Sequence, residues 1–167
     1  MIELKSFSSE HLATTFQWMQ DKSLKRDFMF PSVVTLESHQ IWYENYCKDN
    51  SQRIWAITID GDHVGNIGLK NIDTRNRNAE GWIYVGSSQM RGKKIGSNSW
   101  KKLFENTEFI QLELHKVYSY VAEWNVASQK MFLNAGFCQE GFLREEVFFC
   151  DGYVSLYRFG KLLNKYK

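Results

Sequence analysis

The chain has 167 residues, which is enough for a single domain, residues 1–167, with a sizeable hydrophobic core. Its 21 basic and 19 acidic residues leave a formal charge of +2, which argues against nucleic acid as a partner. The apolar runs are far shorter than a membrane span, and the N-terminus lacks the pattern of a signal peptide.

Cysteine and histidine usage points to a cytoplasmic protein without a metal. Cys47, Cys138 and Cys150 are odd in number and lack CxxC spacing, so we expect them to be reduced thiols. The four histidines are scattered along the chain rather than clustered, so each is expected to be structural or superficial. We therefore predict no metal site. From the net charge and the short apolar runs, we also predict neither a nucleic-acid partner nor association with a membrane.

The first part of the chain combines one strand pattern with two helix patterns. Residues 2–7 alternate apolar and polar side chains, which predicts a strand, and Ser8 or Ser9 then caps a helix. Thr35 begins a second helix. Between them, residues 21–31 are predicted to be irregular, either a packed connector or, in an enzyme, a segment that folds over a substrate.

Strand patterns dominate the remainder, interrupted by two more helices. Asp60-Gly61-Asp62 predicts a tight hairpin turn, and Gly136 predicts the end of the last helix. The predicted strands are residues 53–60, 63–72, 79–86, 116–121, 137–150 and 153–161, and the helices are residues 98–106 and 125–135.

The element order β-α-α-β-β-β-α-β-α-β-β predicts an α+β fold with a mixed, mostly antiparallel central sheet flanked by helices. The strand-helix-strand unit from residue 83 to residue 121 should form a right-handed crossover between two parallel strands. A ligand is then expected beyond the carboxyl ends of these strands.

A basic loop at that position reads Arg91-Gly92-Lys93-Lys94-Ile95-Gly96-Ser97 and leads into a helix. Backbone N–H groups at a helix start carry partial positive charge and can hold a phosphate, and glycine lets the backbone approach a ligand closely. The spacing matches neither GxxxxGK[ST] nor GxGxxG. The alternative is an ordinary basic helix start on the surface.

The same loop resembles the Arg/Gln-x-x-Gly-x-Gly/Ala signature of the GNAT N-acetyltransferases. Gly96 fits that signature, whereas Lys94 stands where the family has glycine. Other stretches match too, in the family's order and spacing: residues 66–73 with 79–86, Asn125-x-x-Ser128 with residues 134–137, and residues 140–144 with 151–153. The chain is thus identified as a member of this superfamily, similar to its RimJ/RimL-like group of ribosomal-protein alanine acetyltransferases.

The resemblance implies acetyl-CoA as co-substrate, bound between two central parallel strands that splay apart. Loop residues 91 to 97 would hold the pyrophosphate. The positions carried over for acetyl-CoA are Ile83, Tyr84, Val85, Arg91, Gly92, Lys93, Lys94, Ile95, Gly96, Ser97, Asn125, Ser128 and Phe132.

The resemblance also implies direct attack of an amine on the thioester, which requires a base. Glu80 matches a family glutamate that serves as this base, although a solvated strand-end carboxylate is the alternative. Many members place a tyrosine proton donor where this chain has Phe132. Ser128 is our substitute, against the alternative of a serine that caps the helix. Tyr84 and Tyr118 are weaker candidates.

For the acceptor amine, the version of the motifs found here is similar to members that act on amino-deoxysugar nucleotides. Arg26, Phe28, Phe30, Glu80 and Trp82 are the predicted acceptor residues, with Arg75 and Arg77 as further cations. A small-molecule amine such as a polyamine or antibiotic is the second hypothesis, and a protein N-terminus the third. A polyamine would require an acidic pocket, for which Glu145, Glu146 and Asp151 are candidates.

Two hypotheses of another class stay open: an acyl-CoA-binding sensor without catalysis, and a scaffold that binds no ligand. The departures at Lys94 and Phe132 favour the sensor. The assembly is expected to be a monomer or a homodimer.

Overall fold

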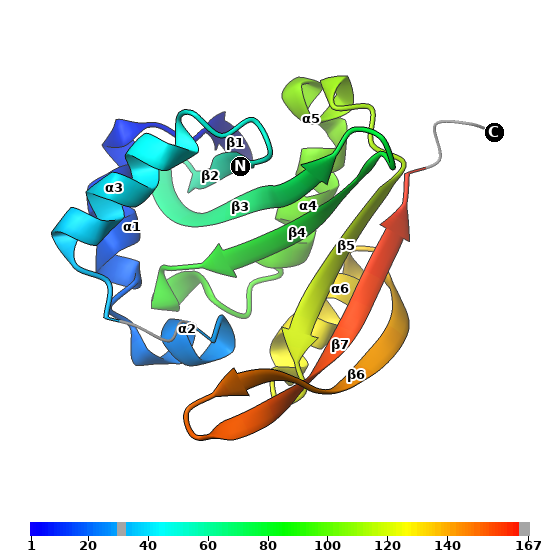
Figure 1. The fold of residues 1–167 in the computed structure, drawn as a ribbon. Helices are drawn as coiled ribbons and strands as arrows, with labels where there is room; N and C mark the ends of the chain where they lie inside the picture. The colour runs from blue at the N-terminus through cyan, green and yellow to red at the C-terminus, as the bar shows by residue number, and fades with distance from the viewer. Residues whose placement is uncertain (30–32, 164–167) are drawn as a thin grey trace.

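The computed structural model describes residues 1–29 and 33–163 (Figure 1). They build a seven-stranded sheet in the order β1-β2-β3-β4-β5-β7-β6. Every neighbouring pair is antiparallel except β4 and β5, so the predicted mixed, mostly antiparallel sheet is confirmed. The strands are β1 (Ile2–Ser6), β2 (Arg53–Ile59), β3 (Asp62–Asp73), β4 (Asn78–Val85), β5 (Lys116–Ala122), β6 (Cys138–Phe149) and β7 (Gly152–Leu162).

Helices flank the sheet on both faces. In Figure 1, α1, α2 and α3 gather on one side of β3 and β4, whereas α4 and α6 lie behind the sheet. Their bounds are α1 (Leu12–Trp18), α2 (Lys22–Asp27), α3 (Leu36–Tyr46), α4 (Ile95–Glu105), α5 (Thr107–Gln111) and α6 (Val126–Asn134), with short 3-10 turns η1 (Ser9–His11) and η2 (Ser88–Met90). Within residues 1–29 and 33–163, none of these helices has the length and apolar character needed to cross a membrane.

Two helices were not predicted from the sequence. The segment expected to be irregular contains α2, because the Asp21 carboxylate accepts the Ser23 N–H at 2.7 Å and caps the helix. In the same way, Asn106 accepts the Phe109 N–H at 3.1 Å and begins α5. Both helices are short and begin at a single capping residue. Their apolar pattern spans too few residues to predict a helix from the sequence.

The start of α4 lies at Ile95, three residues before the predicted position. Lys94 precedes it with φ 60° and ψ 15°, in the left-handed region that glycine adopts without a steric penalty. The lysine thus takes a backbone conformation suited to the glycine of the family signature, and the loop enters α4 one turn earlier than its composition indicates.

The splay between the parallel strands is the feature that positions the site. β4 and β5 pair only at Asn78 with Lys116, Ala79 with Val117 and Glu80 with Tyr118. Beyond Glu80 the two strands separate, as the GNAT resemblance implies, while each continues toward its carboxyl end. The core behind the sheet, built around the fully buried Trp100, holds the paired ends together.

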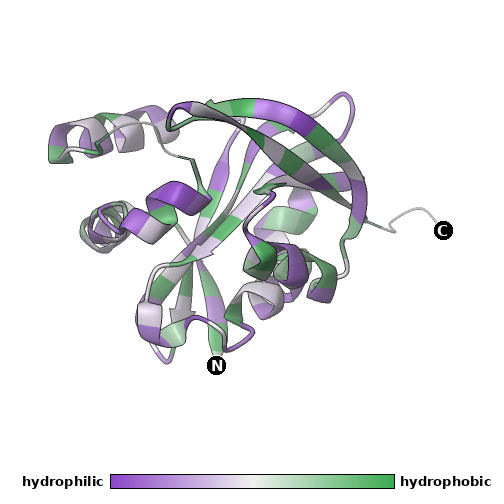
Figure 2. Cartoon of the chain, turned by 90° about the horizontal axis from the view of Figure 1, so that it is seen from below, coloured by the Kyte–Doolittle hydropathy of each residue, from purple (hydrophilic) through white to green (hydrophobic). Residues whose placement is uncertain are grey.

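The β6–β7 hairpin leaves large apolar side chains in solvent. Figure 2 shows hydrophobic and hydrophilic residues alternating along its curved strands. Leu143, Val147 and Phe149 face inward toward a small cluster around Val154, whereas Phe148 and Tyr153 are 64% and 67% exposed. The expectation of a monomer or homodimer stays a prediction.

We predict that Gly81→Ala destabilises the fold by about 1–3 kcal/mol, because overpacking strains a close-packed core. A Cβ at this position would clash with the Trp100 ring and lie 2.9 Å from Val117 Cγ1. Urea denaturation measures the loss. Gly141→Ala is the matched control on β6, where a Cβ has open space. Equal midpoints for the two variants would contradict this account of the β4–α4 contact.

We also predict that Lys94→Gly is more stable than Lys94→Ala by about 1 kcal/mol, since alanine keeps the cost of the left-handed backbone and glycine removes it. Both variants lose the same charge, so their difference isolates the backbone conformation. Thermal and urea unfolding of the pair measure it. If alanine proves as stable as glycine, position 94 does not hold the left-handed conformation in solution.

Candidate active site

Two cavities meet where β4 and β5 part. The first, of about 600 Å³, lies between β4 and the helices α1 to α3. The second, of about 450 Å³, runs along the loop before α4 and one side of α6. The two cavities share part of their lining, so ligands bound in them would meet at these shared residues. The shared residues are Asp27, Phe28, Ile83, Tyr84, Asn125 and Ser128.

The second cavity gathers most of the residues predicted to bind acetyl-CoA. Lys93 is not among its lining, because its side chain turns toward Met90, with Nζ 3.8 Å from the Met90 sulfur. Phe132 lines the first cavity instead and stacks on Phe159, with ring centroids 5.7 Å apart. The predicted residues that do line the second cavity are Ile83, Tyr84, Val85, Arg91, Gly92, Lys94, Ile95, Gly96, Ser97, Asn125 and Ser128.

The start of α4 fits a pyrophosphate. No side chain caps this helix, and its first helical hydrogen bond runs from the Asn98 N–H to the Lys94 carbonyl at 3.0 Å. The preceding N–H groups are those that a helix leaves without internal partners, and they border the cavity. A Cβ at Gly96 would lie 3.0 Å from Met131 Cγ, so glycine keeps this turn close to α6 and the cavity open above it.

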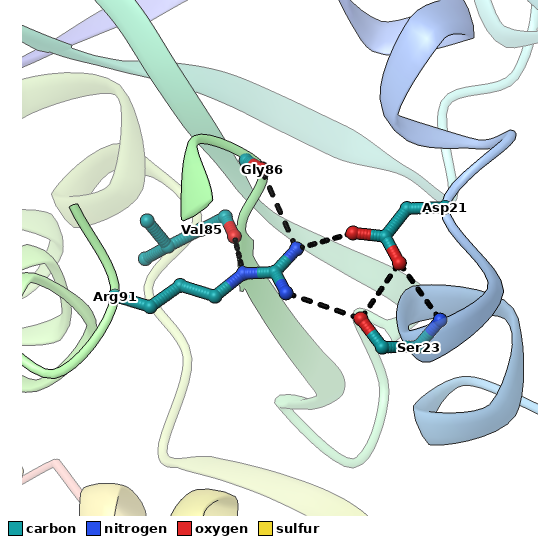
Figure 3. Close-up of polar contacts among 5 residues, drawn as sticks. All are labelled: Asp21, Ser23, Val85, Gly86 and Arg91. Atoms are coloured by element: carbon teal, nitrogen blue, oxygen red, sulfur yellow. Dashed lines mark hydrogen bonds and ion pairs between the residues drawn. The ribbon is translucent and has the colours of Figure 1, made fainter. Parts of the chain in front are cut away.

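The Arg91 guanidinium is directed toward the start of α2, where it meets Asp21 and Ser23 (Figure 3). Its Nε donates to the Val85 carbonyl at 3.0 Å, and Nη2 donates to the Gly86 carbonyl at 3.4 Å. The guanidinium also donates to Ser23 Oγ at 3.1 Å and to Asp21 Oδ2 at 2.9 Å. The hydrogen bond from Ser23, together with the guanidinium, lowers the pKa of Asp21 to about 2.

The first cavity has a floor of side chains from β4. Glu80, Trp82 and Tyr84 alternate onto the same face of the strand, and all three line this cavity. The Trp82 and Tyr84 rings are stacked, with centroids 5.9 Å apart and an interplanar angle of 14°. Glu80 and Trp82, both predicted as acceptor residues, therefore lie at the first cavity.

Glu80 occupies the last paired position before the strands separate. Its carboxylate accepts from Lys70 Nζ at 3.0 Å and from Asn71 Nδ2 at 3.1 Å, and its side chain is only 16% exposed. The Glu80 carboxylate is thus fixed at the cavity wall by these two hydrogen bonds and is not freely solvated.

A buried polar network fixes the far end of the floor. The Asn66 amide donates to Tyr84 Oη at 2.8 Å and to Thr15 Oγ1 at 2.9 Å, and its oxygen lies 2.8 Å from His63 Nε2. Burial raises the pKa of Tyr84 above its usual value and lowers the pKa of His63. We therefore expect both groups to be neutral and the ring of Tyr84 to be held in one orientation.

Helix α2 contributes a wall that the sequence did not reveal in full. Phe28, the C-cap residue of α2, was predicted as an acceptor residue; it lines both cavities and packs edge-on against Tyr84, with ring centroids 5.6 Å apart. Asp27 lines both cavities and was missed, and burial raises the pKa of its carboxyl group. The Asp21-x-Ser23 cap is the sequence signal that would have placed it on a helix.

The basic residues predicted for an anionic acceptor do not converge. Arg26 lies over the Trp124 ring, 5.3 Å from its centroid, and is not in the lining of either cavity. Arg77 donates to the Glu113 carbonyl at 2.8 Å, and Arg75 lies exposed in the β3–β4 turn. Phe30 falls outside the described residues.

The alternative acidic cluster does not form at the cavity either. Glu145, Glu146 and Asp151 are exposed on the β6–β7 hairpin, outside the lining of both cavities. Among residues 1–29 and 33–163, no group of three His, Cys, Asp or Glu side chains is placed to hold a metal ion. Cys47, Cys138 and Cys150 are exposed free cysteines.

Comparison with known proteins agrees with this geometry. The family model of the acetyltransferase (GNAT) domain matches residues 2–138. Spermidine N(1)-acetyltransferase of Escherichia coli (strain K12) is 28% identical over 152 residues, covering 90% of this chain and 80% of that protein. The enzyme of the same name from Vibrio cholerae (serotype O1, El Tor Inaba N16961) is 28% identical over 125 residues, covering 74% of this chain and 71% of the relative.

A solved structure shows the same fold. The spermidine N-acetyltransferase from Vibrio cholerae, crystallised with CoA and spermine, superposes with a TM-score of 0.87 at 22% identity, covering 96% of this chain and 95% of that one. These relatives correct the finer prediction: the similarity is to spermidine acetyltransferases rather than to the RimJ/RimL-like group. The chain belongs to the GNAT acetyltransferase family and is an acetyl-CoA-dependent N-acetyltransferase.

Proposed function

We propose that this enzyme transfers the acetyl group of acetyl-CoA to a primary amine of a polyamine such as spermidine or spermine. The observation that carries the proposal is the charge of the acceptor cavity. Its described lining contains the carboxylates of Asp27 and Glu80 but no arginine, and its lysine, Lys70, is paired with Glu80. Such a wall attracts a cationic amine and repels a nucleoside diphosphate.

The apolar part of the same wall suits the carbon chain of a polyamine. Phe28, Trp42, Trp82, Tyr84 and Tyr120 contribute aromatic rings to the cavity. Aromatic faces attract ammonium groups and also pack against methylene groups, so the two kinds of surface on a polyamine both find partners. The similarity to spermidine N(1)-acetyltransferases supports this assignment over the amino-sugar reading.

The co-substrate fits the second cavity, where bound acetyl-CoA would supply an activated thioester. The N–H groups at the start of α4 would hold its pyrophosphate, and Asn125 lines both cavities. Beyond Glu80, β4 has no ladder partner on its β5 side. Its backbone groups there are open to hydrogen-bond the pantetheine arm and the acetyl carbonyl.

Glu80 is the proposed base. An ammonium must lose a proton before it can attack, and a carboxylate held at the acceptor wall is placed to accept that proton directly or through water. The hydrogen bonds from Lys70 and Asn71 fix its orientation.

Ser128 is the proposed proton donor for the leaving thiolate. Phe132, which has no donor group, occupies the position one turn later on α6. The helix cap uses the Ser128 N–H, which donates to Asn125 Oδ1 at 3.0 Å, so capping does not require the Ser128 hydroxyl. Ser128 also lines both cavities, where the thioester and the amine must meet.

The substrate assignment is tested by thiol release from acetyl-CoA with purified enzyme. The amines are spermidine, spermine, an amino-deoxysugar nucleotide, an aminoglycoside and an alanine-starting peptide. We expect kcat/KM for the two polyamines to exceed the others by about tenfold or more, which is a difference of about 1.4 kcal/mol in transition-state binding. A preference for the sugar nucleotide would overturn the proposal.

For the base, we predict that Glu80→Gln lowers kcat/KM by about 10²-fold near neutral pH, within the range typical of general base catalysis. The deficit should shrink as the pH rises, because the amine then loses its proton to solvent. Glu37→Gln, at an exposed position on α3, is the control. A pH-independent deficit would assign Glu80 to binding alone.

For the donor, Ser128→Ala should lower kcat by about tenfold with little change in KM for acetyl-CoA, since positioning of the reactants supplies much of the rate. Phe132→Tyr in that background should restore turnover by returning a hydroxyl to α6. Ser88→Ala in η2 is the control. Full activity of Ser128→Ala would remove the hydroxyl from the mechanism.

A further inference from the structure

Helix α2 spans the opening between the two halves of the sheet. Figure 1 shows it between the carboxyl end of β4 and the turn of the β6–β7 hairpin. On the β4 side, Leu24 and Phe28 pack in the cluster that contains Tyr84. On the other side, the Arg26 guanidinium covers Trp124, and Met29 beyond the helix packs with the cluster of Ala122, Val154 and Leu156. The position of α2 therefore sets the shape of the acceptor cavity.

The amino end of α2 is tied to the loop that lines the acetyl-CoA cavity. Figure 3 shows Arg91 extending from that loop to Asp21 and Ser23. Its guanidinium donates to Asp21 Oδ2 at 2.9 Å and to Ser23 Oγ at 3.1 Å. The same guanidinium holds the carbonyls of Val85 and Gly86, where β4 ends. One side chain thus connects β4, the loop and α2.

Both partners of this connection are fully engaged. Asp21 Oδ1 accepts from the N–H and the hydroxyl of Ser23, each at 2.7 Å, while Oδ2 accepts from Arg91. Asp21 is therefore at once the cap of α2 and the acceptor of the loop arginine. Charge-assisted hydrogen bonds in a planar fork transmit orientation as well as attraction, and lysine cannot reproduce them.

We propose that Arg91 and Asp21 form a clamp that couples acetyl-CoA binding to the acceptor wall, with both acting as positioning residues. Ordering of the loop by acetyl-CoA holds α2 in place, and α2 presents Asp27 and Phe28 to the acceptor. Because coupling between two sites is reciprocal, a bound acceptor also strengthens acetyl-CoA binding. The inference rests on the proposed function only for the identity of the acceptor.

Amide hydrogen exchange tests the clamp without any acceptor, with coenzyme A at saturation. In the wild type, we expect coenzyme A to slow exchange in residues 87–97 and also in residues 22–28. In Asp21→Asn and Arg91→Lys, it should protect the loop but no longer α2. Arg144→Lys and Asp62→Asn, at exposed positions on β6 and β3, are matched controls and should behave as the wild type. Protection of α2 that persists in both clamp variants would overturn the proposal.

Steady-state kinetics give a second readout that loss of stability alone does not produce. We expect Asp21→Asn and Arg91→Lys each to raise KM for spermidine by about tenfold. Asp21→Asn, at a position outside the lining of both cavities, should change the calorimetric Kd of coenzyme A by less than about threefold. The losses in the double variant should be less than the sum of the two single losses, since both variants break the shared Arg91–Asp21 ion pair. Equal losses of acceptor and coenzyme A binding would overturn the clamp. If the wild type does not acetylate spermidine, only the proposed substrate fails, and the exchange experiment still decides the clamp.

Discussion

The separation of β4 from β5 after Glu80 is the constraint on which the site depends. Parallel strands normally stay paired because an unpaired backbone in a core lacks hydrogen bonds. Here the paired ends are held by the core around Trp100, and the free ends diverge into two cavities. The open ladder leaves backbone groups of β4 without strand partners beside the two cavities, which is where the proposed pantetheine arm would find hydrogen-bond partners. Glu80 lies at the fork, as the last paired residue of β4 and part of the wall of the first cavity.

The two faces of β4 divide the work of the strand. Ala79 and Ile83 belong to the core that anchors the paired end, and Gly81 lies against Trp100 of that core. Glu80, Trp82 and Tyr84 instead alternate onto the floor of the first cavity. Strand periodicity therefore places a charged group and stacked rings together on one wall. That wall receives its remaining charge from Asp27 of α2, a residue more than fifty positions earlier in the chain.

Lys94 and Phe132 both differ from the residues of the family pattern, and the structure accommodates them in different ways. Lys94 keeps the left-handed backbone that a glycine would adopt, so the helix start is preserved at a conformational cost, and the loop still borders the cavity. Phe132 replaces a hydrogen-bonding ring by one that stacks in the core, which removes a proton donor and leaves Ser128 as the hydroxyl nearby on α6. The first departure keeps the backbone conformation before α4, and the second leaves α6 without a hydroxyl at position 132.

By itself, the sequence determined the element order, the mixed sheet, the parallel β4–β5 pair and the loop before α4, because strand and helix periodicities and turn residues act locally. The GNAT resemblance singled out Glu80, and aromatic chemistry singled out Trp82; both line the first cavity. Only the tertiary structure decided the direction of Arg91, the role of α2 and the charge of the acceptor cavity. These features depend on contacts between residues that are far apart in the sequence: Arg91 with Asp21, and Asp27 with Glu80 in one cavity wall. Local sequence patterns do not indicate which distant residues come into contact.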